Sequence, residues 1–287
     1  MAHSAVILPD GRLHLQEGPI DIVIGLAGTR AAQAEARARA TTAFTGLLAA
    51  LAAELPLLRT PLAVDPPALL HPVARRMAAA CWPHRRGFIT PMAAVAGAVA
   101  DHLCAALAET PGLTSAYINN GGDIALHLAP GATLHIGLVR SLRQAASEGM
   151  VRIASADPIR GIATSGWPGR SFSLGIADAV TVLAASAAKA DAAATLIGNA
   201  TNAQHPAIQR APANSLEPDS DLGAQLVTTA VGPLPEATVA AALEAGTALA
   251  EHLLNQGHIH AALIAIGPAS RVVGQARLST SVYGSAP

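Results

Sequence analysis

The sequence predicts an α+β fold, in which long helices pack on largely antiparallel sheets. Short segments that alternate between apolar and polar residues have the two-residue period of strands, and long alanine-rich segments have the composition of helices. The two kinds of segment do not follow the strict strand–helix–strand order that a parallel sheet requires. A chain of 287 residues can bury a sizeable core. We expect a single domain over residues 1–287, with two sub-lobes as the alternative.

The first half of the chain provides strands followed by two long helices. Residues 5–26 have strand character on both sides of a Pro-Asp-Gly turn. Residues 30–58 predict one long alanine-rich helix that ends near Pro56. Residues 73–82 predict a short helix, and residues 91–109 predict a second long one, composed almost entirely of small residues.

Strands predominate in the second half of the chain. Alternating apolar patterns predict strands within residues 115–128, 132–140, 149–166, 174–186, 259–267 and 270–279. Two helices are predicted among them, at residues 187–201 and 235–257. Residues 205–227 are irregular at first and then extended.

Composition limits the partners and the compartment. Aromatic residues make up only 2% of the chain, so the core must be aliphatic. Charged residues make up 13%, well below the usual quarter, and this favours a homo-oligomer whose surface is partly covered. The net charge of −1 gives no argument for nucleic-acid or membrane binding.

Cys81 and Cys104 are expected to be buried free thiols. The N-terminal residues lack the pattern of a signal peptide, so we expect a cytoplasmic protein.

The first candidate site motif is the string "NNGGD", residues 119–123, between two strand-like segments. Glycines allow a ligand to approach the backbone, and exposed N–H groups can bind phosphate oxygens. Asp123 could accept hydrogen bonds from a ligand. The alternative is a hairpin turn with a capping aspartate.

The second candidate motif is "ATSG", which ends an apolar run. Thr164, Ser165 and Gly166 offer hydroxyl groups and an open backbone, and these suit phosphate or carbonyl contacts. The alternative is a plain turn.

The third candidate motif is "ADAAAT". Asp191 and Thr195 are four residues apart, so they share one face of a helix, and three alanines between them keep that face open. A carboxylate and a hydroxyl are hard oxygen ligands that could hold Mg²⁺ together with a ligand phosphate and waters. The alternative is an acid near a helix N-terminus, with Thr195 bonded back to its own helix.

The order and spacing of these three motifs resemble the ApbE superfamily, the FAD:protein FMN transferases. The string "AGAVADHL", residues 96–103, stands where that family has a glycine-containing helix start. The motifs cover residues 87–200, and the pattern is closest to a cytoplasmic branch known as uncharacterised protein family 0280. The resemblance implies an ApbE-like α+β fold, Mg²⁺ and FAD as cofactors, a flavin nucleotide or other small phosphorylated ligand, and an acceptor protein.

The resemblance also assigns roles to particular residues. Asp191 and Thr195 would be catalytic residues and metal ligands, with the carbonyl of Asn120 as a third ligand. Gly121, Gly122 and Asp123 would line the nucleotide. Thr164, Ser165 and Gly166 would lie near the flavin or its phosphates.

The sequence departs from the family pattern at two places. Ala96 stands where family members usually carry a lysine, and residues 167–180 lack the family's histidine and Asp-Pro pair. Two alternatives therefore stay open beside FMN transfer. One is a different small-substrate enzyme on the same scaffold, and the other is a non-catalytic flavin-binding, ligand-binding or assembly protein.

A cluster of basic residues lies just before the proposed helix start. It could bind a phosphate or an acidic partner, or it could be a solvated loop. Its members are Arg75, Arg76, His84, Arg85 and Arg86.

Overall fold

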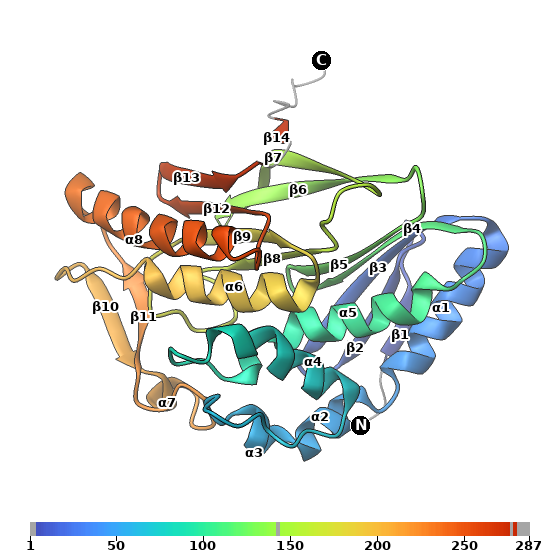
Figure 1. Cartoon of the computed structure of the whole chain (residues 1–287), viewed down its shortest axis with the longest axis horizontal. Helices are drawn as coiled ribbons and strands as arrows, with labels where there is room; N and C mark the ends of the chain where they lie inside the picture. The colour runs from blue at the N-terminus through green and yellow to red at the C-terminus, as the bar shows by residue number, and fades with distance from the viewer. Residues whose placement is uncertain (1–3, 142–143, 276–277, 280–287) are drawn as a thin grey trace. The chain divides into compact units, whose positions relative to one another are not determined.

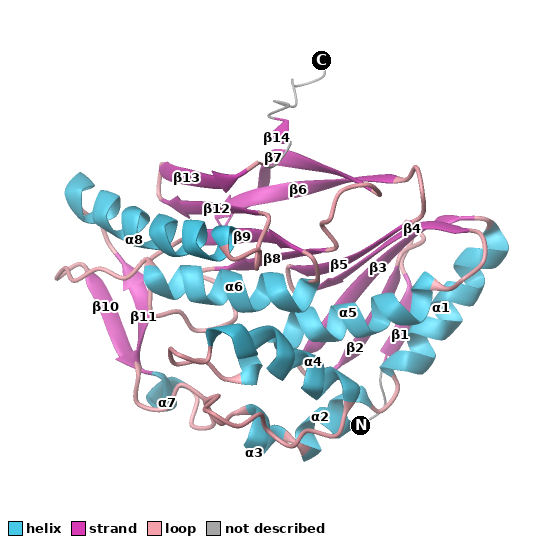
Figure 2. Cartoon of the chain, viewed as in Figure 1, coloured by secondary structure: helices cyan, strands magenta, loops and turns pink. Residues whose placement is uncertain are grey.

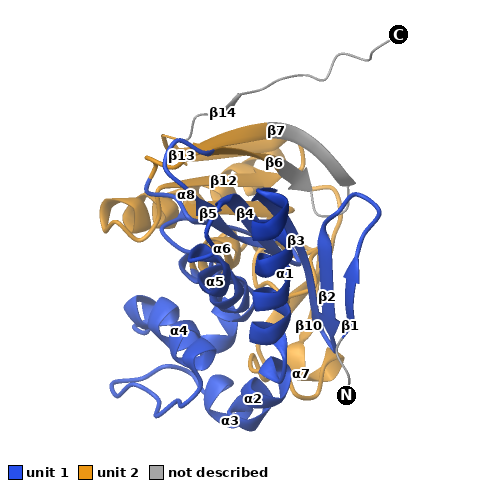
Figure 3. Ribbon diagram, turned by 90° about the vertical axis from the view of Figure 1, so that its right-hand side faces the viewer, with its two compact units in different colours: residues 1–132, 158–163, 184–192 blue, residues 133–157, 164–183, 193–287 orange. Residues whose placement is uncertain are grey.

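The computed structural model describes residues 4–141, 144–275 and 278–279. The chain divides into two compact units (Figure 3). Unit 1 consists of residues 1–132, 158–163 and 184–192, and unit 2 consists of residues 133–157, 164–183 and 193–287. The prediction of a single domain over residues 1–287 stays a prediction.

Unit 1 is built on an antiparallel sheet, labelled in Figure 1. Its first five strands pair in chain order, and β8 pairs with β5. In β2, β3 and β4 the side chains largely alternate between buried and less buried positions, so one face forms the core. The strands are β1 (Ser4–Ile7), β2 (Leu13–Glu17), β3 (Ile20–Gly28), β4 (Leu113–Asn120), β5 (Asp123–Leu128) and β8 (Gly161–Ser165).

Helices pack on the buried face of this sheet. Helix α5 contacts β4 and β5, α1 contacts β3, and α4 lies against α5. The predicted helix over residues 30–58 is wrong as a single element. The chain turns at Gly46, where φ is +77°, and three shorter helices result. The helices of unit 1 are α1 (Arg30–Phe44), α2 (Leu47–Ala53), α3 (Leu55–Leu58), α4 (Pro72–Cys81) and α5 (Val95–Ala108), with 3-10 turns η1 (Trp82–His84) and η2 (Pro91–Ala94).

Unit 2 contains three groups of antiparallel strands and helix α8 (Figure 2). Strand β12 lies between β9 and β13, and α8 packs on β12 and β13. The other two groups are β6–β7–β14 and β10–β11. The elements are β6 (Thr133–Ser141), β7 (Gln144–Ala154), β9 (Ala179–Ala184), β10 (Ile208–Pro212), α7 (Ala213–Leu216), β11 (Leu226–Val231), α8 (Glu236–Asn255), β12 (Ala261–Ile266), β13 (Ala269–Gly274) and β14 (Leu278–Ser279).

Helix α6 (Ala187–Ala200) begins in unit 1 and ends in unit 2. Its alanines are almost completely buried, including Ala192, Ala193 and Ala194 between the two predicted metal ligands. The expectation that the face carrying Asp191 and Thr195 is open stays a prediction, since both of these residues are half-buried. The small size of the three alanines allows the backbone of α6 to pack closely against its surroundings.

The described core is aliphatic, as the composition predicts. Phe44 is the one aromatic residue among the largest fully buried side chains of the described residues. Cys81 and Cys104 are both buried and free, which confirms that prediction. The α+β class is confirmed by the mixture of helices and antiparallel strands. Among the described residues, one helical stretch, Pro91–Ala108, is long and apolar enough to cross a membrane, but more than half of it is buried as a core helix of unit 1.

Candidate functional site

The glycine motif forms the two-residue turn of the β4–β5 hairpin. Asn120 pairs with Asp123 across the turn, and both glycines have positive φ, +68° at Gly121 and +113° at Gly122. Such turns require φ > 0 at both central positions, and this explains the second glycine. The N–H of Gly122 donates to Oδ1 of Asn119 at 2.8 Å. That amide is therefore already engaged within the hairpin.

Asn120 joins this hairpin to the start of helix α5. Its side chain is buried, and its Nδ2 donates to the carbonyl of Ala96 at 3.1 Å. A buried side-chain amide that bonds a backbone carbonyl fixes the distance between the two elements. The turn and the first turn of α5 are thus held together within unit 1.

Asp191 caps the start of the same helix α5. Residue Ala94 at the N-cap position of α5 has no side chain that could accept a hydrogen bond from the helix. The N–H of Gly97 instead donates to Oδ2 of Asp191 at 3.0 Å, and the Ala96 backbone also donates to this carboxylate. A carboxylate at a helix N-terminus satisfies orphan amides and interacts favourably with the helix dipole.

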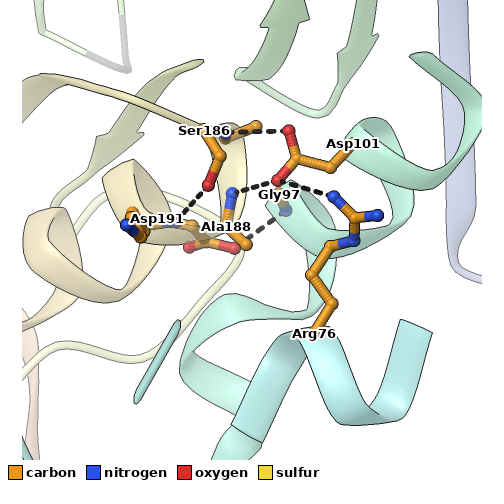
Figure 4. Close-up of polar contacts among 8 residues, drawn as sticks. Arg76, Gly97, Asp101, Ser186, Ala188 and Asp191 are labelled. Atoms are coloured by element: carbon orange, nitrogen blue, oxygen red, sulfur yellow. Dashed lines mark hydrogen bonds and ion pairs between the residues drawn. The ribbon is translucent and has the colours of Figure 1, made fainter. Parts of the chain in front are cut away.

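Asp101 performs the converse task for helix α6 (Figure 4). Its two carboxylate oxygens accept the N–H groups of Ala187 and Ala188, each at 3.0 Å. The next amide, that of Lys189, donates to Oγ of Ser186 at 3.3 Å. The first three amides of α6 are therefore all satisfied by side chains.

The two helices form a reciprocal pair. Gly97 precedes Asp101 by four residues, Ala187 precedes Asp191 by four residues, and each aspartate binds the amide of the other helix. The helices meet at Gly97, where an added Cβ would overlap the carbonyl of Ala187 and lie 2.7 Å from the nitrogen of Ala188. Only glycine permits this approach. The role of Asp101 was not predicted from the sequence, because its partners lie on another helix.

The two aspartates differ in their electrostatic surroundings. Desolvation raises the pKa of Asp191 to about 7, and the charge of Asp101 acts in the same direction. Desolvation also raises the pKa of Asp101, against the opposing effects of the Ala188 and Ala187 amides and the Arg76 guanidinium. Nη1 of Arg76 lies 3.9 Å from Oδ2 of Asp101. Asp101 therefore has a cationic neighbour, whereas within the described parts of the chain the charge of Asp191 is favoured by the backbone amides of Gly97 and Ala96 and by no cation.

The donor set around Asp191 is compatible with a hard cation. The desolvated Asp191 carboxylate lies near the charge of Asp101, and a divalent ion would offset this excess of negative charge. Thr195 lies one helical turn further along α6 and is half-buried. Helical threonines elsewhere in the chain, such as Thr41 and Thr45, donate to the carbonyl four residues earlier. No such bond is found for Thr195 in the part of the chain that the structure describes.

No group of three or more His, Cys, Asp or Glu side chains suitable for a metal occurs among the described residues. A cation at Asp191 would therefore need oxygen donors of other kinds, such as the Thr195 hydroxyl, a backbone carbonyl or ligand oxygens.

The "TSG" motif lies at the end of β8, in unit 2. Oγ1 of Thr164 and Oγ1 of Thr181 are 2.9 Å apart, so the two hydroxyls form a hydrogen bond. Ser165 lies beside α6, because its Oγ would be 3.7 Å from a Cβ built on Gly198. Gly166 has a packing role, since a Cβ there would lie 2.5 Å from the carbonyl oxygen of Asp178. The ligand contacts predicted for these three residues stay predictions.

The chain is similar in sequence to several curated proteins. The chain is 38% identical to a UPF0280 protein of Methanospirillum hungatei over 128 residues, which are 44% of this chain and 50% of that protein. It is 40% identical to a UPF0280 protein of Methanopyrus kandleri over 162 residues, which are 55% of this chain and 61% of that protein. The chain spans about half the length of the curated relatives it matches first.

Two solved structures are similar over almost the whole chain. They are the flavinyl transferase ApbE of Pseudomonas stutzeri, with 13% identity, a TM-score of 0.44 and coverage of 95% of this chain and 93% of that one, and the flavin transferase ApbE of Vibrio cholerae, with 14% identity, a TM-score of 0.42 and coverage of 95% and 97%. The family model described as "AbpE bacteria" matches residues 5–278. The chain therefore belongs to this ApbE-like family, as a relative of the UPF0280 proteins.

Proposed function

We propose that this protein is a Mg²⁺-dependent transferase that moves FMN from FAD to a hydroxyl group of an acceptor protein. In such a reaction the acceptor oxygen forms a bond to the phosphorus of the FMN half. The pyrophosphate P–O bond breaks, AMP leaves, and the hydroxyl proton passes to solvent. Support comes from family membership and from the hydrogen-bonded cluster around Asp191.

Each residue of the cluster has a part in this proposal. Asp191 and Thr195 hold the metal ion, with the carbonyl of Asn120 as a third donor. When bound, Mg²⁺ offsets the negative charge that develops on the pyrophosphate as the bond breaks. Gly121, Gly122 and Asp123 line the nucleotide, and Thr164, Ser165 and Gly166 are the predicted contacts of the flavin end.

One observation carries the proposal furthest. Asp191 is fixed by the first turn of α5, and that same turn is fixed by Asn120 at the glycine hairpin. Two motifs that are separated by about seventy residues in the sequence are therefore joined through α5 in unit 1. Hydrogen bonds therefore hold two of the proposed donor residues, Asp191 and Asn120, in fixed positions, and this preorganises the site for a ligand.

Calorimetric titration tests the proposal. Purified protein is titrated with FAD, FMN, ADP and ATP, with and without Mg²⁺, beside the variants Asp191→Asn and Thr195→Val. We expect FAD binding that requires Mg²⁺ and that both variants weaken by about tenfold or more, since one lost metal ligand costs at least about 1.4 kcal/mol. No nucleotide binding under either condition would refute the flavin proposal.

The same titrations separate the alternatives. Mg²⁺-dependent binding of ATP or ADP without FAD would favour a different enzyme on this scaffold. FAD binding that is independent of Mg²⁺ and unaffected by Asp191→Asn would favour a non-catalytic flavin-binding protein. A second step, mass spectrometry of candidate acceptor proteins after incubation with FAD, detects the covalent addition of FMN.

A further inference from the structure

Residues 57–88 of unit 1, here called the α3–α4 corner, have an unusual charge. The corner contains five arginines (Arg59, Arg75, Arg76, Arg85 and Arg86) and one acid, Asp65. Five positive charges and one negative charge give a net charge of +4, in a chain whose total is −1. The rest of the protein is therefore acidic, and the corner is a local positive region rather than part of a general excess.

Three arginines of the corner are available to a partner. Arg75, Arg85 and Arg86 are all exposed. Among the described residues, none of the three forms an ion pair with an acid. Arg85 is also held in place, because its guanidinium stacks 4.4 Å from the centroid of the Trp82 ring and its Nη1 donates to the Trp82 carbonyl at 3.0 Å. An ordered arginine loses little side-chain entropy when it binds.

Exposed apolar side chains gather in the same corner. Nine large hydrophobic side chains are exposed among the described residues, and four of them lie within residues 57–88. Val64 and Leu70 are 87% and 82% exposed, which are the two largest exposed fractions among these nine side chains. The other two are Leu57 and Phe88.

Hydrogen bonds hold these apolar residues in defined positions. The N–H of Leu62 donates to the carbonyl of Ile89 at 2.9 Å, and this places the Val64 loop beside the Phe88 segment. The Glu54 carboxylate accepts the N–H groups of Leu70 and His71 at 2.6 and 2.7 Å. These hydrogen bonds order the loop, and the same stretch of chain carries the exposed arginines and apolar side chains. Such mixtures are typical of the centre of protein–protein interfaces.

The corner borders the Asp191 cluster. Helix α4 packs on α5, and Figure 3 shows α4 beside α5 within unit 1. Arg76, on α4, reaches Asp101, whose carboxylate caps α6. A polypeptide bound at α4 would therefore lie near the contact between α5 and the start of α6, where Asp101 and Asp191 accept the helix amides.

We propose that the α3–α4 corner is the docking surface for the acceptor polypeptide, and that it recognises an acidic segment with apolar side chains close to the modified hydroxyl. This inference rests on the proposed function. Charge complementarity favours an acidic partner, and the four exposed apolar side chains require a partner that can cover them. A nucleic-acid backbone would leave them against phosphates.

Two labelled synthetic peptides provide the probe. Both contain one threonine among leucines and phenylalanines. One carries glutamates at the remaining positions, and the other carries lysines at the same positions. Binding is measured by fluorescence anisotropy at low and at physiological salt. We expect the glutamate peptide to bind at least about tenfold more tightly than the lysine peptide, and the difference to shrink as salt is raised.

Matched variants locate the binding surface. The corner variant Arg75→Glu/Arg85→Glu/Arg86→Glu should weaken binding of the glutamate peptide by about tenfold or more. The control Arg30→Glu/Arg152→Glu/Arg271→Glu changes three other exposed arginines by the same total charge and should have little effect. A second variant, Val64→Ser/Leu70→Ser, should weaken binding without changing its salt dependence. Equal binding of the two peptides, or equal losses in the corner and control variants, overturns the inference.

Further measurements separate this inference from its rivals and from the proposed function. The corner variant leaves Asp191, Thr195 and Asn120 intact, so its Mg²⁺-dependent FAD binding should equal that of the wild type. No FAD binding by the wild type overturns the transfer function, whatever the peptides do.

Two other occupants of the corner are tested separately. If the corner binds vesicles that contain phosphatidylserine and shows no preference between the two peptides, the partner is a membrane and the inference is overturned. A wild-type dimer that the corner variant dissociates, seen by sedimentation, overturns it in favour of a second copy.

Discussion

Helices α5 and α6 each place an aspartate four residues after the point where the two helices meet, yet the two acids are in different surroundings. Asp101 is only 7% exposed, both its oxygens accept amides of α6, and Arg76 lies nearby. Asp191 is half-buried as a residue although its carboxylate is desolvated, accepts amides at the start of α5, and is followed one turn later by Thr195 rather than by an alanine. The corresponding position after Asp101 is Ala105.

This difference distinguishes a structural acid from a candidate ligand-binding acid. The oxygens of Asp101 are fully used in holding the helices together. Asp191 shares that work, but no cation lies beside it among the described residues, and the Thr195 hydroxyl follows one helical turn later. We therefore attribute the stability of the helix pair mainly to Gly97 and Asp101, and we propose that Asp191 is the acid that binds the metal.

The largest expected effect comes from closing the gap between the helices. The side chain introduced by Gly97→Val would overlap the backbone of Ala187 and Ala188. That backbone belongs to helix α6 and cannot shift without moving the helix. We expect a loss of about 3 kcal/mol or more in the free energy of unfolding, measured by urea denaturation. Gly87→Ala is the control, because the nearest atom to a Cβ there is 3.9 Å away. Equal losses in the two variants would contradict the proposed role of Gly97.

Removal of the two caps should show the difference directly. Asp101→Ala leaves two buried amides of α6 without acceptors, and we expect a cost of about 2–4 kcal/mol. Asp191→Ala should cost less, about 1–2 kcal/mol, because burial and the charge of Asp101 disfavour its ionised form and so reduce the benefit of the cap. Thermal and urea unfolding of both variants measure the difference. A larger loss for Asp191→Ala would reverse the assignment.

The raised pKa of Asp191 predicts a pH dependence. An aspartate with a raised pKa binds its proton more tightly in the folded chain than in the unfolded chain. Its stabilising contribution is present below the usual aspartate pKa and is lost as the pH rises through the raised value. Without Mg²⁺, wild-type stability should fall between about pH 4 and pH 7. Asp191→Asn should reduce that fall by about 1 kcal/mol or more, since each unit of pKa shift corresponds to about 1.4 kcal/mol.

The control for this measurement is Asp65→Asn, which neutralises an exposed acid and should leave the pH profile unchanged. Addition of Mg²⁺ should also flatten the wild-type profile above neutral pH, because a bound cation favours the ionised carboxylate. An Asp191→Asn profile parallel to that of the wild type would show that this carboxylate does not titrate in the expected range.

The smallest expected effect concerns Arg76. Its side chain is 41% exposed, and its nitrogen lies 3.9 Å from Asp101. Exposed ion pairs contribute little, so Arg76→Ala should change the free energy of unfolding by less than about 1 kcal/mol. Chemical denaturation at low and high salt measures this. A larger loss would mean that Arg76 is a structural part of the helix pair.

Local features of this fold followed from the sequence, whereas distant partners did not. The Gly121-Gly122 turn, the start of α6 and the aliphatic core were visible as patterns of turn residues and periodicity. The break at Gly46 was missed because alanine-rich sequence on both sides outweighed one glycine. The bond between Gly97 and Asp191 joins residues 94 positions apart, and no local pattern specifies such a pair. Asp101 was missed for the same reason, since its partners lie on another helix.

The central claim is that Asp101 holds the helices together while Asp191 binds the metal and its nucleotide. The most direct test is calorimetric titration of Asp101→Asn and Asp191→Asn with FAD and Mg²⁺, at a temperature where circular dichroism shows both variants folded. The account predicts that Asp101→Asn is the less stable protein but binds FAD within about threefold of the wild type, and that Asp191→Asn loses about tenfold or more. Equal binding losses in the two variants, or a larger loss in Asp101→Asn, would contradict it.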